Sequence, residues 1–245
     1  MKILKNIEIL EEHLGLFIKD ESTLVIADLH IGYEAALEKQ GIQIPRSQYP
    51  KIKEEVKKMI ESCEPELLII NGDVKHEFGE ATKQEWREVL DFLNFLLSKN
   101  IRIIVVRGNH DNFLIPILRK RDIELKDPWF ILGNYLFVHG HKQIHPKILD
   151  AGVSTVIMAH EHPAIVLRDE LGVKRKFKCF LKGKLYGKDL VVLPALSPLM
   201  EGSEINVLDE KSLLSPLLRT CDLRTFDSFV VESNVGIYKF PLGYV

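Results

Sequence analysis

The chain has 245 residues, of which 46% are apolar and 28% charged, and its formal net charge is −2 at pH 7. These values are typical of a globular protein with a substantial core, and the charge excludes a surface that is basic all over, as tight non-specific DNA binding requires. No apolar run approaches the roughly 18 residues of a membrane span, and Met1–Lys5 does not begin a signal peptide. With three widely separated cysteines, we expect a protein of the reducing cytoplasm with no membrane partner.

Short apolar runs, bounded by Gly, Asn or Asp, predict five buried strands in chain order. They are Leu24–Ala27, Leu67–Ile70, Ile101–Val106, Tyr135–Val138 and Thr155–Ala159. Helices are predicted at Gln48–Ser62 and at Glu80–Ser98, and the second has an apolar face. That face consists of Trp86, Val89, Leu90, Leu93 and Leu97. The C-terminal part predicts two more strands, Ser228–Val231 and Val235–Phe240. We expect a single α/β domain over residues 1–245, with helices outside two packed sheets.

Side chains that can bind a metal follow each of the five predicted strands. They are Asp28 and His30, then Asp73, then Asn109, His110 and Asp111, then His139 and His141, and finally His160 and His162. In an extended strand, residues i and i+2 point to the same face, so Asp28 and His30 are expected to point one way, as are His160 and His162. Ligands at the carboxyl ends of neighbouring strands converge on one crevice. Gly72 and Gly108 are expected where the backbone turns sharply beside an ion.

The donor set contains two carboxylates, one amide oxygen and several imidazoles, without a thiolate. Nitrogen and oxygen donors of this kind suit Mn²⁺, Fe or Zn, and a carboxylate such as Asp73 can bridge two ions. The set therefore indicates metal-assisted hydrolysis of a phosphate ester.

The motif order D-x-H, G-D, G-N-H-D, H and H-x-H resembles the calcineurin-like metallophosphoesterase superfamily. The residues in these motifs are similar to those of the archaeal SbcCD-related branch and of the bacterial ligase-associated phosphoesterases. The resemblance covers about residues 20–200 and implies a four-layer αββα sandwich of two mixed sheets flanked by helices, which strands within 205–245 complete. It implies two divalent transition-metal ions, with Mn²⁺ expected first and Fe or Zn as alternatives. One ion would be held by Asp28, His30, Asp73 and His162, and the other by Asp73, Asn109, His139 and His160. His110 would act on the substrate.

Two positions depart from the family pattern. Ala159 stands before His160, where the family usually has glycine. His76 stands where the family usually has the second carboxylate of G-D-x-x-D, which orients the catalytic histidine in some relatives. Asp111 and Glu77 are the nearest candidate partners for His110, and His141 matches no ligand position. We expect these four residues to contact the metal ligands or His110 without binding an ion themselves: His76, Glu77, Asp111 and His141.

The resemblance implies a mechanism and several substrates. Two divalent ions bring a charge of +4 and Asp28 with Asp73 brings −2, which leaves +2 to bind a bridging hydroxide and a phosphate ester. The hydroxide would attack phosphorus while His110 donates a proton to the leaving oxygen or stabilises charge on the phosphoryl group. A phosphodiester, cut by a nuclease or phosphodiesterase, is expected first. A small-molecule phosphatase or cyclic-nucleotide phosphodiesterase is the alternative, because the related nucleases carry an additional DNA-capping domain. A non-catalytic interaction scaffold is disfavoured, since His110 is present and no ligand position is vacant.

A basic run supports two interpretations. Between Lys174 and Lys188 lie Lys174, Arg175, Lys176, Lys178, Lys182, Lys184 and Lys188, with Phe177 and Phe180 interleaved. The run could track a nucleic-acid backbone while the aromatic rings stack on bases. It could instead form an antiparallel hairpin with its lysines in solvent, turning at Gly183 or Gly187. The partner is thus a phosphate ester, with nucleic acid among the candidates, and the sequence does not indicate an oligomeric state.

Overall fold

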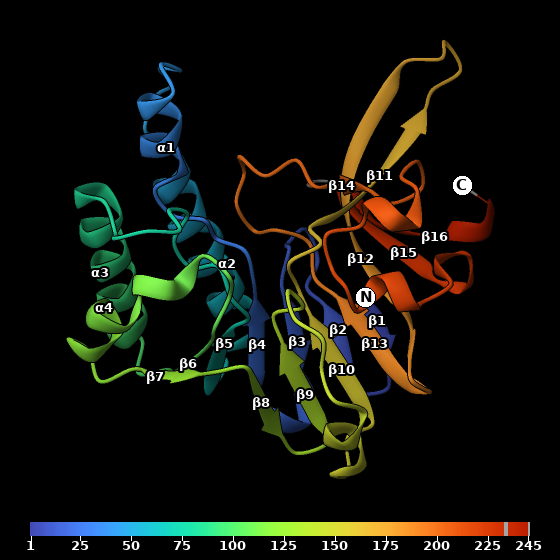
Figure 1. The fold of residues 1–245 in the computed structure, drawn as a ribbon, viewed down its shortest axis with the longest axis horizontal. Helices are drawn as coiled ribbons and strands as arrows, with labels where there is room; N and C mark the ends of the chain where they lie inside the picture. The colour runs from blue at the N-terminus through green and yellow to red at the C-terminus, as the bar shows by residue number, and fades with distance from the viewer. Residues whose placement is uncertain (233–234, 245) are drawn as a thin grey trace.

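A computed structural model describes residues 1–232 and 235–244, and its strands form two mixed sheets (Figure 1). The seven-stranded sheet runs in sequence order through β1 (Lys2–Leu4), β2 (Ile7–Ile9), β3 (Leu16–Ile18), β4 (Thr23–Ile26), β5 (Leu67–Ile70), β6 (Arg102–Val106) and β7 (Glu124–Lys126). Its first four strands pair antiparallel, whereas β4 to β7 pair parallel. The carboxyl ends of β4, β5 and β6 therefore meet at one edge.

The nine-stranded sheet contains the rest of the strands. They are β8 (Trp129–Leu132), β9 (Tyr135–Val138), β10 (Thr155–Met158), β11 (Pro163–Arg168), β12 (Lys174–Leu185), β13 (Lys188–Val192), β14 (Ser203–Glu204), β15 (Asp227–Glu232) and β16 (Gly236–Pro241). The order is β14-β11-β12-β13-β10-β9-β8, and β15 joins β12 and β16. Here β9, β10 and β13 are parallel, so the carboxyl ends of β9 and β10 also meet.

The α-helices of the described residues lie on the side of the first sheet (Figure 1). They are α1 (Tyr33–Lys39), α2 (Gln48–Cys63), α3 (Lys83–Leu97) and α4 (Ile115–Arg119). Helices α2 and α3 confirm the two predicted helices, but the predicted apolar face of α3 was partly wrong. Phe92 and Leu96 are buried whereas Leu97 is exposed, because the sheet contacts a stripe rotated from the predicted one.

Three apolar cores separate four layers. One core lies between the first sheet and the α-helices and contains Leu24 and Phe92. The second lies between the two sheets and contains Val25 and Phe137. The third covers the outer face of the second sheet and contains Leu217. Alternation along β4 produces this division, since Leu24 and Val25 point to opposite faces. The αββα fold class is confirmed.

The outermost layer on the second sheet is made by short 3₁₀ helices. The 3₁₀ helices of the chain are η1 (Lys19–Glu21), η2 (Asp111–Phe113), η3 (Pro146–Asp150), η4 (Glu210–Ser212), η5 (Leu218–Thr220), η6 (Leu223–Thr225) and η7 (Leu242–Tyr244). Of these, η3, η5, η6 and η7 contribute residues to the third core. Among the described residues, no helix combines the length and the apolar character needed to cross a bilayer.

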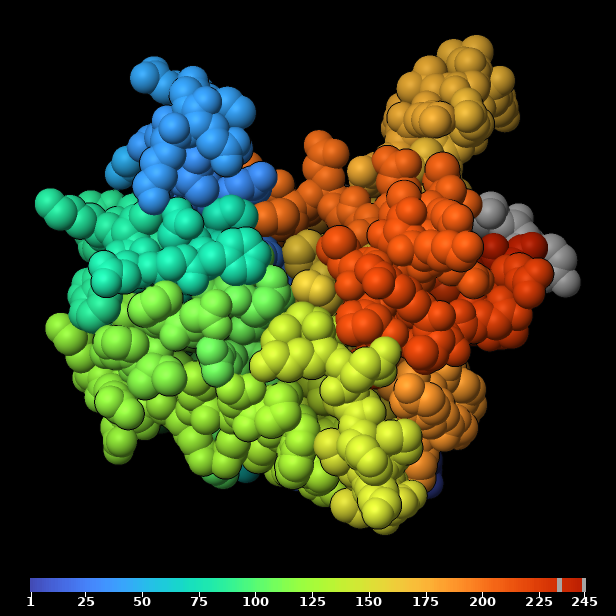
Figure 2. All heavy atoms as spheres, in the orientation of Figure 1, coloured from blue at the N-terminus to red at the C-terminus, as the bar shows by residue number. Residues whose placement is uncertain are grey.

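The C-terminal strands β15 and β16 extend the second sheet, as predicted within 205–245. Residues 233, 234 and 245 of that predicted range lie outside the described part of the chain. The β11–β12 hairpin projects from the body of the molecule (Figures 1 and 2). Strand β12 then pairs antiparallel with β13, and the chain turns at Tyr186 and Gly187, not at Gly183.

Candidate metal centre

The loops that follow β4, β5 and β10 hold five of the predicted ligands in left-handed backbone. Their φ angles are +54° for Asp28, +46° for His30, +53° for Asp73, +68° for His160 and +50° for His162. The expectation that Asp28–His30 and His160–His162 continue as extended strands was therefore wrong. Non-glycine residues avoid this region, and such strain gathers at functional sites.

Backbone hydrogen bonds between loops hold these conformations. The Asp28 N–H donates to Gly72 O at 3.0 Å, and the His30 N–H donates to Asp73 O at 2.9 Å. The Ser197 N–H donates to Asp28 O at 3.1 Å. The loops after β4 and β5 are thus joined to each other and to the segment that follows β13, so the side chains of Asp28, His30 and Asp73 converge.

The first donor cluster consists of Asp28, His30, Asp73 and His162, and its ligand atoms all lie within 4.8 Å of one another. His30 Nε2 is 3.7 Å from Asp73 Oδ2, and His162 Nε2 is 3.4 Å from Asp28 Oδ2. Asp28 Oδ1 and His30 Nδ1 are buried without a hydrogen-bond partner among the described residues. A buried carboxylate oxygen without a donor fits a bound cation.

The second donor cluster consists of Asp73, His139 and His160, again within 4.8 Å, and Asn109 adjoins it. His139 Nε2 is 3.2 Å from Asp73 Oδ2 and 3.0 Å from Asn109 Oδ1. The other ring nitrogen of His139, Nδ1, donates to Asn71 O at 3.0 Å. That bond fixes the tautomer and directs Nε2 into the site, as is usual for metal-ligating histidines.

The pKa values of the side chains in the two clusters are shifted by burial and by the charges of neighbouring side chains. Burial lowers the pKa of His30 and of His160 to about 3, which leaves both imidazoles neutral with a lone pair free. Burial is the largest single effect on Asp73 and opposes its ionisation, but the charge and hydrogen bond of His139, with the charges of nearby histidines, together hold the pKa of Asp73 well below its usual value. Burial is also the largest single effect on His139 and would lower its pKa, yet the charges of Asp73 and Asp28 together with hydrogen bonds to Asp73 and Asn71 raise it to about 9. Asp73 and His139 thus form an ion pair that metal binding would replace.

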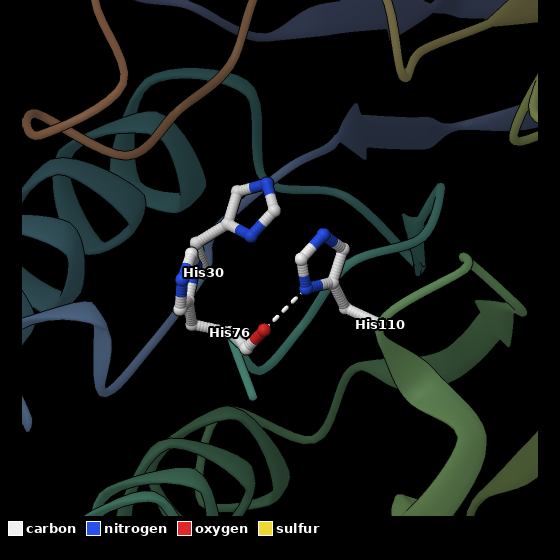
Figure 3. A group of neighbouring side chains, drawn as sticks. All are labelled: His30, His76 and His110. Atoms are coloured by element: carbon white, nitrogen blue, oxygen red, sulfur yellow. Dashed lines mark hydrogen bonds between the residues drawn. The ribbon is translucent and has the colours of Figure 1, made fainter. Parts of the chain in front are cut away.

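His110 lies beside the first cluster with one ring nitrogen already bonded. Its Nδ1–H donates to the backbone carbonyl of His76 (Figure 3). The partner of His110 is therefore a carbonyl rather than the carboxylate of Asp111 or Glu77. The free Nε2 is 3.9 Å from Asp73 Oδ2. The His76 ring stacks instead on Tyr33, at 4.0 Å between ring centroids, and burial lowers the pKa of His76 to about 4.

The remaining predicted supporting residues have separate contacts. Asp111 is fully buried and accepts the N–H groups of Asp73 at 2.8 Å, Gly108 at 2.9 Å and Val74 at 3.0 Å. Glu77 pairs with Lys39 at 2.9 Å, away from His110. His141 lies next to the second cluster, with its ring centroid 5.3 Å from that of His139. Asp111 thus shapes the loop that carries Asp73.

Sequence reasoning missed two buried residues that hold the ligand loops. Glu161, between His160 and His162, accepts the N–H groups of Leu214 at 3.1 Å and Ser215 at 2.8 Å. Gln48 donates its side-chain amide to His30 O at 3.0 Å and to Ser197 Oγ at 2.7 Å. The sequence could have indicated the role of Glu161, since a charged residue between two candidate ligands is unusual. It could not have indicated the role of Gln48, because a glutamine is an ordinary residue at the start of a helix.

Two glycines allow the loops to approach one another. Gly72 has a φ of +95°, and a Cβ there would collide with the His139 ring. A Cβ on Gly108 would collide with Asp73. Both positions agree with the prediction of sharp backbone turns beside the site.

Three of the seven basic residues between Lys174 and Lys188 make side-chain contacts within the described part of the protein: Lys176, Lys178 and Lys184. Phe180 is fully buried, so its ring is not free to stack on bases, whereas Phe177 is half-buried against the outer core of the second sheet. Lys178 donates to Ala195 O at 2.8 Å and to Ser197 O at 2.5 Å. Lys176 pairs with Glu204 at 2.9 Å. The stacking role is contradicted for Phe180 alone, and the hairpin interpretation, with its turn at Gly187, fits.

Known proteins resemble this chain in sequence and in fold. The DNA double-strand break repair protein Mre11 of Nanoarchaeum equitans is 30% identical over 86 residues, which are 35% of this chain and 22% of that protein. The match thus spans about a fifth of that curated relative. The crystal structure of Pseudomonas putida nuclease MPE superposes with a TM-score of 0.63 at 21% identity, covering 90% of each chain, which shows a shared fold.

The family comparison covers most of the motifs. The sequence model of the calcineurin-like phosphoesterase family matches residues 22–177. That range includes both donor clusters and His110, and it amounts to more than half of the chain. The chain therefore belongs to the calcineurin-like phosphoesterase family.

Proposed function

We propose that this chain is a phosphodiesterase that uses two divalent metal ions, with a nucleic-acid diester as substrate. The observation that carries the proposal is that Asp73 lies in both donor clusters. One carboxylate shared by two sets of ligands is the arrangement that places two ions side by side. Asp28, His30, Asp73 and His162 would hold one ion, and Asp73, Asn109, His139 and His160 would hold the other.

The donor atoms fit Mn²⁺ best, with Fe or Zn as alternatives, because carboxylate and amide oxygens stand beside imidazoles without a thiolate. When bound, the two ions supply charge for the phosphate oxygens and lower the pKa of water from 15.7 toward about 7.

His110 is the residue that would act on the leaving group. Its Nδ1–H is bonded to His76 O, so Nε2 is the nitrogen that faces the site. The His110 N–H also donates to Asp73 Oδ1 at 2.9 Å, which holds the residue beside the shared carboxylate. A proton carried on Nε2 would pass to the leaving oxygen as the bond to phosphorus breaks. General-acid help of this kind is worth about 10²- to 10⁴-fold in rate.

Two features support a nucleic-acid diester. The relatives reported above are named as a nuclease and as a DNA repair protein. A general acid also matters most for an alkoxide leaving group such as a ribose oxygen, which leaves poorly without a proton.

A small phosphate ester is the second candidate, and the basic run favours it. Lys178 is bonded to two backbone carbonyls and Phe180 is buried, so neither residue is available to a long strand. With a net charge of −2, the chain is also not adapted to a long polyanion.

Turnover by the Mn²⁺-loaded protein tests both candidates. Substrates should be single-stranded DNA, a dinucleotide, a cyclic nucleotide, bis-p-nitrophenyl phosphate and p-nitrophenyl phosphate. His110→Ala should retain two ions by elemental analysis and lose activity, with the larger loss for poor leaving groups. His145→Ala is the matched control, because His145 is exposed and lies outside both clusters.

Each outcome of that experiment has a distinct meaning. Turnover of DNA and dinucleotide supports the nucleic-acid diester, whereas turnover of the cyclic nucleotide or the monoester alone supports the second candidate. A His110→Ala protein that loses its ions would show that His110 is a ligand. A folded wild-type protein that binds no Mn²⁺ would refute the site.

A further inference from the structure

We propose that Phe78 is a stacking platform for the nucleobase of the leaving nucleoside, and so determines the specificity of the reaction. The inference deepens the proposed function and rests on its nucleic-acid diester. Phe78 stacks on the His110 ring, with ring centroids 3.7 Å apart and planes 29° apart. The Phe78 side chain is nevertheless 55% exposed. One face of the ring is therefore used by His110, and the rest of the ring is open to a ligand.

The loop that carries Phe78 is held rigidly by buried charges. Lys75 is fully buried, and its Nζ donates to the carbonyl of Glu77 and, at 3.3 Å, to that of Gly79. These two residues flank Phe78 on either side. Glu85, also fully buried, accepts the His76 N–H at 3.1 Å and the Glu77 N–H at 2.6 Å.

Burying a lysine and a glutamate costs free energy unless their hydrogen bonds compensate it. Here those bonds fix the backbone on both sides of a phenylalanine that reaches solvent. An apolar ring that is held in place yet exposed contributes little to a core. It is preorganised for a ligand, because little side-chain and loop entropy remains to be lost on binding.

The position of Phe78 selects the kind of ligand. His110 acts at the leaving oxygen, and in a nucleic-acid diester that oxygen belongs to a nucleoside. The base of that nucleoside is one sugar away from the leaving oxygen, and Phe78 is an exposed ring in contact with His110. A phenyl ring offers a flat apolar face without donors or acceptors, so it accepts any of the bases. Phe180 cannot take this role, because it is fully buried between the two sheets, and Phe177 packs part of its ring against the outer core of the second sheet.

A competing explanation is that Phe78 acts only through His110, by holding the imidazole ring in place. The two roles differ in their dependence on the substrate. A positioning role affects every substrate that needs a general acid. A stacking role affects only a substrate with a base on the leaving side.

The test compares two dinucleotides that differ only in whether the leaving nucleoside carries a base or is abasic. With the Mn²⁺-loaded protein, Phe78→Leu should lower kcat/KM for the base-bearing dinucleotide by about 5- to 150-fold more than for the abasic one. Phe78→Trp should retain the preference. Tyr238→Leu is the control, because Tyr238 is an aromatic residue of similar exposure on β16, at an edge of the second sheet. It should change neither value.

Binding gives a second readout without turnover. A dinucleotide with 2-aminopurine on the leaving side should lose fluorescence on binding to wild type and to Phe78→Trp, but not to Phe78→Leu. Equal losses of kcat/KM on both dinucleotides, with unchanged quenching, would overturn the stacking role and leave a positioning role. A wild-type protein that cleaves neither dinucleotide would instead overturn the proposed function, and the stacking role with it.

Discussion

Asp73→Asn is the substitution that most directly tests a shared carboxylate. The amide has nearly the same shape, and its oxygen can still accept the His110 N–H, which Asp73 Oδ1 accepts at 2.9 Å. The change removes a negative charge 3.2 Å from His139 Nε2 and 3.7 Å from His30 Nε2. Because those nitrogens belong to different clusters, we expect a folded protein that has lost affinity for both ions.

The size of the effect follows from the geometry. The donor atoms of each cluster lie within 4.8 Å of one another, so a bound ion would lie within about 4 Å of the Asp73 carboxylate. At about 4 Å and an effective dielectric constant of about 20, a carboxylate and a divalent ion attract each other by about 8 kcal/mol, twice the value for two unit charges. The amide oxygen that replaces the carboxylate keeps part of this attraction, so the loss is closer to the cost of removing one member of a buried ionic pair, about 3–5 kcal/mol. We therefore expect Kd for each ion to rise roughly 10³-fold.

Titration calorimetry with Mn²⁺, together with elemental analysis after dialysis, measures this effect. Wild type should bind two ions, and Asn109→Ala should keep one tight site, because Asn109 Oδ1 contacts only the second cluster. Asp73→Asn should retain neither at the same concentration, with its circular dichroism unchanged. Two ions bound with wild-type affinity would refute the shared carboxylate, and the loss of one ion would assign Asp73 to a single cluster.

Three further predictions concern the surroundings of the ions. Lys178→Met should weaken Mn²⁺ binding by about 10- to 100-fold in calorimetry. The reason is that Lys178 donates a hydrogen bond to Ser197 O, while the Ser197 N–H donates to Asp28 O and so helps to hold this ligand. Unchanged affinity would show that Lys178 does not help to position Asp28. Mn²⁺ binding at pH 8 should release the His139 proton, because burial is outweighed by the combined charges and hydrogen bonds of its neighbours, Asp73 first, which raise the pKa of His139 to about 9. The release should fade as pH rises above that value. Calorimetry in buffers of different ionisation enthalpy measures this release, and equal heats in all buffers would contradict it. Gly72→Ala should lower the free energy of unfolding by more than about 1 kcal/mol, and Tm by a few degrees. The reason is that φ of Gly72 is +95° and the added methyl group would collide with the His139 ring. An unchanged melting curve would argue against that contact.

The sequence predicted the strands that carry the site because their signal is local. Leu67–Ile70 and Tyr135–Val138 were placed at their observed bounds, since each apolar run ends where polar residues begin. The helix Gln48–Ser62 was placed within one residue of α2 for a similar reason. The buried face of α3 was placed less well, because the sheet beneath it decides which side is covered.

The geometry within the site could not be read from local patterns. The i, i+2 argument brought Asp28 and His30 to one place, but the structure does so with left-handed backbone. The bonds that hold this backbone come from Gly72 and Ser197, which are distant in sequence. The partner of His110 was missed for a related reason, because a backbone carbonyl leaves no mark on residue identity.

Each donor cluster draws side chains from both sheets, and this affects how the protein unfolds. Asp28, His30 and Asp73 follow strands of the first sheet, whereas His162 follows β10 of the second. Neither sheet could assemble a complete cluster before the two have packed together. Ions would then bind only once the two sheets have packed, late in folding. Such late contacts slow unfolding and leave the folding rate nearly unchanged. The metal would thus cross-link the two sheets, and its removal would shorten the lifetime of the native state.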